Sequence, residues 1–124
     1  MISVVDDDLS LLRALRRLLQ TAGFVVETYG SAEEFVQVAH SPPPECVVLD
    51  INLGTLSGFD VRDRILAAGV SIPIIFITGH DSPAMRERAR KAGAVGYLCK
   101  PFEDQALISA IETAIKGADP AMNA

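Results

Sequence analysis

Five short apolar runs, each followed by a segment with helical periodicity, constrain the fold of this chain more than any other feature. The runs indicate strands at residues 2–5, 24–28, 46–49, 72–77 and 94–99. Apolar residues between and after them recur at helical spacing, which predicts helices that end near residues 22, 39, 68, 92 and 116. Strands and helices that alternate through short connections are typical of a parallel sheet covered by helices on both faces.

The third run, Cys46–Leu49, is apolar without interruption, as expected for a strand buried on both faces of a sheet. We therefore expect an α/β fold: a doubly wound, five-stranded parallel sheet of strand order 2-1-3-4-5, flavodoxin-like, with five helices. In this order the winding reverses between the first and third strands, and ligands bind outside the carboxyl ends of the strands at such a point. Asp50 directly follows the third run and is the first candidate for a site there.

Length and charge limit the classes of function. With 124 residues the chain is long enough for one domain with its own core. A formal net charge of −5 argues against nucleic-acid binding through a broad basic surface. No apolar run approaches a membrane span, and the first residues lack the basic region of a signal peptide. Cys46 and Cys99 fall in separate predicted strands, so we expect buried thiols and a cytoplasmic location.

Polar residues stand directly after four of the five apolar runs. Asp6 and Asp7 follow the first, Asp50 the third, Thr78 the fourth and Lys100 the fifth. Because parallel strands end at one edge of the sheet, we expect these side chains to lie together. Two carboxylates about 5 Å apart repel by roughly 3 kcal/mol at an effective dielectric constant of 20. Three of them would destabilise the fold unless a cation or a proton intervenes.

These residue types suit phosphoryl transfer. Mg²⁺ prefers oxygen ligands, needs few protein groups and shares phosphate oxygens. An aspartate such as Asp50 can act as a nucleophile and form an acyl phosphate. The ammonium of Lys100 can pair with the phosphate, and the hydroxyl of Thr78 can donate to one of its oxygens.

Residues 1–116 resemble a bacterial response-regulator receiver domain, and residues 117–124 are expected to be a flexible tail or a truncated linker. The motifs that carry this resemblance are Val5–Asp8, Val48–Leu53, Ser57–Gly58, Ile77–His80, Lys91–Ala94 and Tyr97–Phe102, in this order and at these intervals. The stretch from Thr78 to Phe102 is most similar to receivers of transcription factors with a LuxR-type helix-turn-helix domain.

The resemblance implies a metal site and a phosphoacceptor. Asp50 would accept a phosphoryl group from a sensor histidine kinase or phosphotransfer protein. Asp7 and Asp50 would bind Mg²⁺ (or Mn²⁺) directly, with the backbone carbonyl of Asn52 as a third protein ligand and Asp6 assisting through water.

The resemblance also assigns the residues that sense the phosphate. Thr78 and Lys100 would contact the phosphoryl oxygens, and Tyr97 would turn inward when Thr78 moves. The bond between Lys100 and Pro101 is expected to be cis, a form that proline readily permits. One departure is Gly54, where the family usually has proline, and we expect a looser loop there.

The implied function is a phosphorylation-dependent signalling switch rather than a turnover enzyme, although it would catalyse its own phosphotransfer and slow dephosphorylation. Its output face would be the fourth helix, the fifth strand and the last helix. The output would be transcription, through a domain absent from this chain or a protein partner, so DNA is reached only through an effector domain. The apolar stripe with Ile108 and Ile115 leaves a phosphorylation-dependent homodimer open.

Other interpretations of the same residues stay open at this point. A phosphatase of the haloacid-dehalogenase type also uses an aspartate nucleophile, but it needs Asp-x-Asp where this chain has adjacent Asp6 and Asp7. A flavodoxin-like FMN carrier needs a hydroxyl-rich loop at that place. A receiver that binds without being phosphorylated would lack a key residue, and none is missing. Asp8 is expected to cap a helix, His80 to be exposed, and Tyr97 has the simpler alternative of a strand aromatic.

Overall fold

The computed structural model describes residues 1–38, 40 and 42–117 of the chain, and its centre is a parallel sheet. The strands are β1 (Ile2–Val5), β2 (Val26–Tyr29), β3 (Cys46–Asp50), β6 (Ile74–Thr78) and β7 (Gly96–Cys99). They lie in the order β2-β1-β3-β6-β7, and every neighbouring pair is parallel. Counted along the chain as five strands, this is the predicted order 2-1-3-4-5, which is confirmed.

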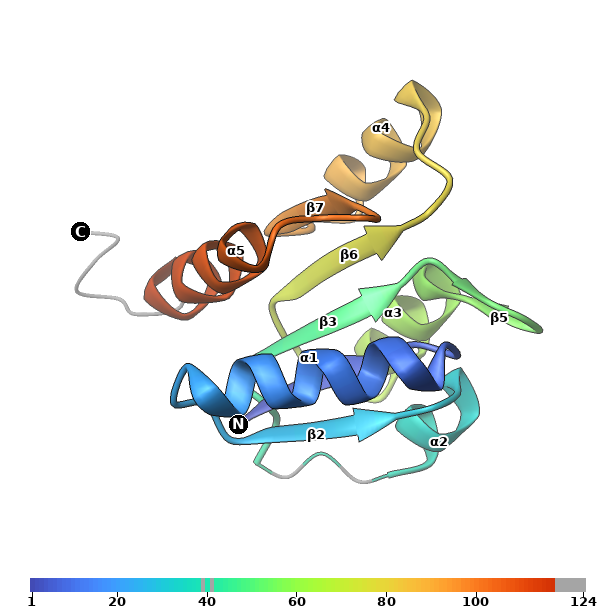
Figure 1. The fold of residues 1–124 in the computed structure, drawn as a ribbon. Coiled ribbons are helices and arrows are strands. Elements are labelled where there is room, and N and C mark those ends of the chain that lie inside the picture. Colours follow the sequence, from blue (N-terminus) through green and yellow to red (C-terminus); the bar gives the residue numbers. More distant parts are fainter. Residues whose placement is uncertain (39, 41, 118–124) are drawn as a thin grey trace.

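Helices cover both faces of the sheet (Figure 1). On one face lie α1 (Leu9–Thr21) and α5 (Asp104–Gly117). On the other lie α2 (Ala32–Gln37), α3 (Gly58–Ala67) and α4 (Pro83–Lys91). Each layer encloses its own cluster of buried apolar side chains. The doubly wound arrangement predicted from the sequence is therefore present.

The central strand β3 supplies both clusters. Its side chains alternate, so that Val47 and Leu49 pack under α2, α3 and α4, whereas Cys46 and Val48 pack under α1 and α5. All five of its residues are buried, which is why this segment is apolar at every position before Asp50. Cys46 is a free buried thiol, as expected, and Cys99 is free and half-buried.

The structure differs from the prediction mainly in the loop after Asp50. This loop contains a small antiparallel hairpin, β4 (Asn52–Leu53) and β5 (Leu56–Ser57), that the sequence pattern did not predict. Gly54 begins its turn with φ of +82°, a conformation that glycine adopts without steric cost. The loop is therefore a hairpin with glycine in its turn, and the greater looseness expected from the missing proline stays a prediction.

Element boundaries show smaller differences. Strands β2, β6 and β7 each begin two residues later than predicted. Helix α5 includes Gly117, although residues 117–124 are predicted to be a tail. The rest of the predicted tail, residues 118–124, and the predicted end of α2 at residue 39 lie outside the described residues.

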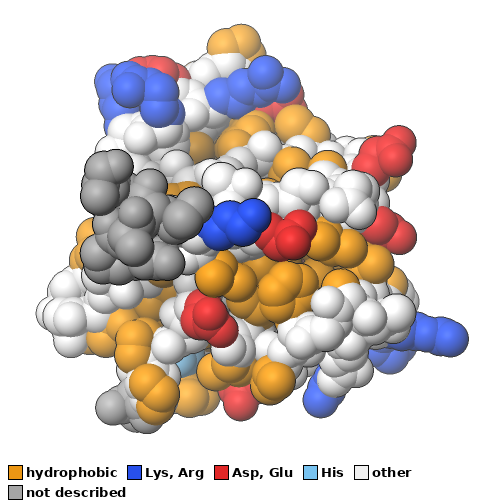
Figure 2. Space-filling model, turned by 90° about the vertical axis from the view of Figure 1, so that its left-hand side faces the viewer, with side chains coloured by type: hydrophobic (Ala, Val, Ile, Leu, Met, Phe, Trp, Pro, Cys, Tyr) orange, Lys and Arg blue, Asp and Glu red, His pale blue; other side chains and the backbone are white. Residues whose placement is uncertain are grey.

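Figure 2 views the side of the molecule where the strands begin, opposite the edge at which Asp50 lies. Lys and Arg side chains gather at the top of this view, at the height of α4. Two of the basic residues of α4 are paired with acids, Arg86 with Asp81 and Arg90 with Glu87. Within the described residues, no helix is both long and apolar enough to cross a bilayer.

Candidate functional site

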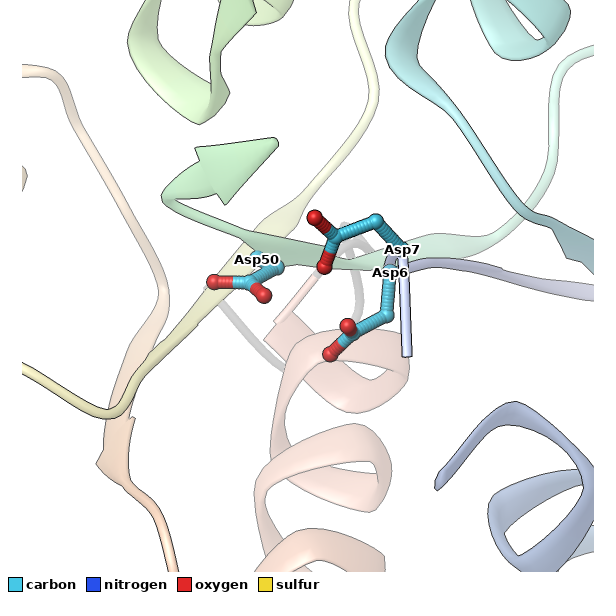
Figure 3. A group of neighbouring side chains, drawn as sticks. All are labelled: Asp6, Asp7 and Asp50. Atoms are coloured by element: carbon cyan, nitrogen blue, oxygen red, sulfur yellow. The ribbon is translucent and has the colours of Figure 1, made fainter. Parts of the chain in front are cut away.

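Three carboxylates face one another at the carboxyl end of the sheet. Asp50 is the last residue of β3, and Asp6 and Asp7 directly follow β1, the neighbouring strand. Because Val5 pairs with Leu49, the two strands bring these acids to the same level. One carboxylate oxygen from each of the three residues lies within 4.8 Å of the others. Figure 3 shows the three groups converging from the ends of the two strands.

Backbone N–H groups and one ammonium hold the two buried carboxylates. Oδ1 of Asp6 accepts from the N–H of Asp8 (2.9 Å), and Oδ1 of Asp50 accepts from the N–H of Asn52 (3.0 Å). The Nζ atom of Lys100 donates to Oδ2 of both acids, at 2.8 Å from Asp6 and 3.0 Å from Asp50. Asp6 is fully buried and Asp50 is 3% exposed, whereas Asp7 is exposed.

Burial and charge act in opposite directions on this cluster. Burial raises the pKa of Asp6 above its usual value, the nearby charge of Asp50 adds to this, and the hydrogen bonds from Lys100 and Asp8 oppose it. Burial alone would lower the pKa of Lys100, but its hydrogen bonds to Asp6 and Asp50 outweigh burial and raise it. One ammonium therefore balances only part of the negative charge gathered at this edge.

Thr78 and Lys100 reach the same edge from the next two strands. Thr78 ends β6, which pairs with β3, and Lys100 follows β7, which pairs with β6. Thr78 is fully buried, and its Oγ1 accepts from the N–H of His80 (3.0 Å). The N–H of Lys100 donates to the carbonyl of Thr78 (2.7 Å). The bond between Lys100 and Pro101 is cis, as expected.

Tyr97 lies on β7, half-buried, and makes contacts outside the acid cluster. Its ring packs at the edge of the apolar cluster under α4, and its hydroxyl donates to Oδ1 of Asp81 (2.8 Å). Burial, together with the hydrogen bond to Asp81 and its charge, raises the pKa of Tyr97 to about 12. The sequence pattern pointed to Tyr97 but gave no indication of its partner.

Gly58 packs closely against the backbone of Asp50 and Ile51, a contact the sequence pattern did not reveal. Its N–H donates to the carbonyl of Ile51 (2.8 Å). A Cβ atom at Gly58 would lie 2.7 Å from the carbonyl oxygen of Asp50 and 3.1 Å from Cα of Ile51. Both are backbone atoms that cannot move aside. The motif Ser57–Gly58 was the available signal, but the contact itself depends on how α3 approaches β3.

Two residues near the cluster have the simpler roles expected of them. Asp8 caps α1, since Oδ1 accepts from the N–H groups of Ser10 and Leu11, both at 3.1 Å. His80 is exposed. Asn52 is also exposed, and its N–H donates to the carboxylate of Asp50. That its backbone carbonyl binds the metal stays a prediction.

The donor set suits a hard divalent cation. Carboxylate oxygens are the ligands that Mg²⁺ prefers, and a site with few protein groups leaves positions for water and phosphate. The excess negative charge of Asp6, Asp7 and Asp50 over Lys100 would be neutralised by such an ion. The residues present therefore fit the ion that the sequence resemblance implied.

A doubly wound sheet with acids, a hydroxyl and an ammonium at its switch point is the arrangement of signalling receiver domains. A family model described as the response regulator receiver domain matches residues 2–112. This chain belongs to that family, and the resemblance inferred from the sequence motifs is confirmed. Receiver domains serve phosphorylation-dependent signalling in two-component systems and bind Mg²⁺ through acidic residues; they are not classical enzymes.

Known relatives agree with this assignment. Nodulation protein W of Bradyrhizobium diazoefficiens is 44% identical over 111 residues, which cover 90% of this chain and 49% of that protein. Transcriptional regulatory protein FixJ of the same organism is 38% identical over 120 residues, 97% of this chain and 58% of that protein. The chain thus spans about half the length of these curated relatives.

A solved structure gives the same result for the fold. The crystal structure of a response regulator receiver protein from Burkholderia phymatum is 43% identical and superposes with a TM-score of 0.82. The alignment covers 96% of this chain and 97% of that one. Family membership favours the signalling interpretation over the phosphatase and the FMN carrier.

Proposed function

We propose that this chain is a phosphorylation switch in which Asp50 accepts a phosphoryl group from the phosphohistidine of a sensor histidine kinase or a phosphotransfer protein. The observation that carries the proposal is the position of Asp50: nearly buried, within 4.8 Å of two more aspartates, and 3.0 Å from the ammonium of Lys100. Asp6 shares the cation partner and the group of acids but is fully buried, whereas Asp50 keeps 3% of its surface exposed.

In the transfer, a carboxylate oxygen of Asp50 forms a bond to phosphorus while the bond between phosphorus and the imidazole nitrogen breaks, and the electron pair leaves with the imidazole. Asp6, Asp7, Asp50 and the carbonyl of Asn52 would hold Mg²⁺, which when bound offsets the negative charge of the acids and of the phosphoryl oxygens. Lys100 supplies a second positive charge to those oxygens, and the hydroxyl of Thr78 donates to one of them.

The transmitted change is a population shift between two conformations. When Lys100 and Thr78 turn to the phosphoryl group, they give up their contacts with Asp6 and with the loop before α4. The face formed by α4, β7 and α5 then changes and controls an output, which is transcription through an effector domain or a protein partner. Ile108 and Ile115 are half-buried against the core, so the proposed homodimer would use other residues of that face as well.

The test is covalent labelling of the protein by acetyl phosphate in the presence of Mg²⁺, followed by intact mass measurement. The chain should gain one phosphoryl group, and Asp50→Asn should gain none. Asp63→Asn, an exposed acid paired with Arg62 on α3, is the matched control and should label normally. Labelling of Asp50→Asn at another residue would reject the assignment. The cytoplasmic location stays a prediction.

A further inference from the structure

The loop between β6 and α4 carries a polar network that the acid cluster does not use. Asp81 lies in this loop, and its carboxylate accepts from Nε of Arg86 (2.9 and 3.1 Å) and from Nη2 of Arg86 (2.5 Å). The same carboxylate accepts from the hydroxyl of Tyr97 at 2.8 Å. The guanidinium of Arg86 also lies 6.0 Å from the centre of the Tyr97 ring. Asp81 therefore joins β7 to the first turns of α4.

This network fixes the side chain of Tyr97 with its hydroxyl at the surface. A hydrogen bond to a charged carboxylate is stronger than one between neutral groups, and the bidentate guanidinium holds the carboxylate in a single orientation. The hydrogen bond and charge of Arg86, with the hydroxyl of Tyr97, keep the pKa of Asp81 well below its usual range, so the acceptor stays charged. In this orientation Tyr97 forms one wall of a groove of about 390 Å³ between α4 and β7.

The same loop begins at Thr78, which links the network to the phosphate site. Asp81 is only three residues beyond Thr78, and the N–H of His80 donates to the hydroxyl of Thr78. Ser82 then caps α4 by accepting from the N–H of Met85 (3.0 Å). Because the loop is short and bonded at both ends, we expect a movement of Thr78 to shift the backbone that carries Asp81.

We propose that Asp81, held by Arg86, is a positioning residue that keeps Tyr97 in its outward orientation before phosphorylation. Phosphorylation of Asp50 then has to break the bond between Tyr97 and Asp81 before the tyrosine turns inward. This inference rests on the proposed function, since it concerns how the switch is biased. Asp81 touches neither the phosphoryl group nor the metal; it acts through Tyr97.

Removing this bond should favour the switched state and tighten the binding of a phosphoryl mimic. We expect Asp81→Ala to bind beryllofluoride with Mg²⁺ about fivefold more tightly than the unmodified chain, as loss of one hydrogen bond to a partly exposed charged group implies. Glu87→Gln breaks an exposed ion pair of the same helix, between Glu87 and Arg90, and is the matched control with unchanged affinity.

A double-mutant cycle separates this effect from a general loosening of α4. Asp81→Ala should tighten beryllofluoride binding when Tyr97 is present but not in the Tyr97→Phe background. The hydroxyl through which Asp81 acts is absent from that background. The chain has two tyrosines and no tryptophan, so labelling with 3-fluorotyrosine gives two ¹⁹F signals, assigned by Tyr97→Phe. Without any mimic, the Tyr97 signal of Asp81→Ala should move toward the position that beryllofluoride produces in the unmodified chain.

The outcomes are distinct. If the unmodified chain responds to beryllofluoride but Asp81→Ala matches it in affinity and in ¹⁹F shift, the positioning role is wrong and the proposed function stands. An equal effect of Asp81→Ala in both tyrosine backgrounds also overturns the role, because the effect then passes through α4. If the unmodified chain does not bind beryllofluoride with Mg²⁺, the proposed function fails, and the positioning role fails with it.

Discussion

The Nζ atom of Lys100 lies 3.0 Å from Oδ2 of Asp50, although the two residues are 50 positions apart in the chain. The same ammonium donates to Asp6 at 2.8 Å. In this state the lysine serves as the counter-charge of the acids that the proposed function assigns to metal binding and phosphorylation. Lys100 and Mg²⁺ therefore compete to neutralise the same carboxylates, and this competition leads to the first prediction.

We predict that Lys100→Met destabilises the metal-free protein and strengthens its binding of Mg²⁺. Without the ammonium, the buried Asp6 and Asp50 lose their partner, which should cost about 2 kcal/mol, less than for a fully buried pair because Lys100 is 25% exposed. Urea unfolding without metal and thermal shift against Mg²⁺ concentration measure both effects. Lys116→Met, at an exposed position, is the control. Weaker Mg²⁺ binding by Lys100→Met would contradict the competition.

We predict that Asp50→Asn stabilises the metal-free protein by about 1 kcal/mol, because it removes one of three crowded negative charges. Lys100 keeps its bond to Asp6, and the amide oxygen of the new side chain can still accept a hydrogen bond. The melting temperature in EDTA should rise, and the stabilisation by added Mg²⁺ should be smaller. A lower melting temperature in EDTA would show that the pair between Lys100 and Asp50 outweighs the repulsion among the acids.

We predict that Gly58→Ala destabilises the fold by about 2 kcal/mol and slows phosphorylation of Asp50. The added Cβ atom would meet backbone atoms of Asp50 and Ile51 at 2.7 and 3.1 Å, so the phosphoacceptor strand must shift. Gly79→Ala is the control for the unfolding free energy, since nothing lies within 4 Å of a Cβ atom there. Equal unfolding free energies for the two variants would show that α3 shifts to make room for the added Cβ atom while Asp50 stays in place.

The sequence was sufficient to predict the sheet order and the gathering of the strand-end residues. Uninterrupted apolar runs identify buried parallel strands, and parallel strands bring their following residues to one edge, so Asp6, Asp50, Thr78 and Lys100 could be placed together from spacing alone. These relations depend only on topology, which is why they needed no side-chain geometry.

Contacts that depend on side-chain geometry were not predictable. The sequence marked the loop of Thr78 to Asp81 and the aromatic Tyr97 separately, but their bond depends on the orientation of a tyrosine across 16 residues of chain. The hairpin after Asp50 was missed because β4 and β5 have only two residues each, too few to show a period of alternation. The family usually has proline at the position of Gly54, and the looser loop expected there stays a prediction.

We predict that restoring this proline is harmful here. Proline fixes φ near −65°, whereas Gly54 has φ of +82°, so Gly54→Pro should disrupt the hairpin turn and cost about 2 kcal/mol of unfolding free energy. Gly54→Asn is the matched control, because asparagine tolerates positive φ better than other residues and should cost less. Urea unfolding measures both values. A stable Gly54→Pro variant would mean that the loop readily adopts a second conformation.

The last prediction concerns acid stability and Asp81. Hydrogen bonds from Arg86 and then Tyr97 lower the pKa of Asp81 in the folded protein, below the value of 3.8 expected for the unfolded chain. A group with a lowered folded pKa contributes stability above its unfolded pKa and loses that contribution as the pH falls through the folded pKa. The unmodified chain should therefore be more stable than Asp81→Asn at pH 6, and the difference should shrink below about pH 4.

Melting temperatures of the metal-free proteins between pH 6 and pH 3 measure this difference, and comparing two variants cancels the titration of the acid cluster. Arg86→Gln removes the main donor to Asp81. In this background, adding Asp81→Asn should therefore change the melting temperature less, and the change should depend less on pH. A difference between the unmodified chain and Asp81→Asn that stays constant down to pH 3 would mean that Arg86 does not stabilise the charged form of Asp81 in solution. The outward orientation of Tyr97 would then lack its proposed support.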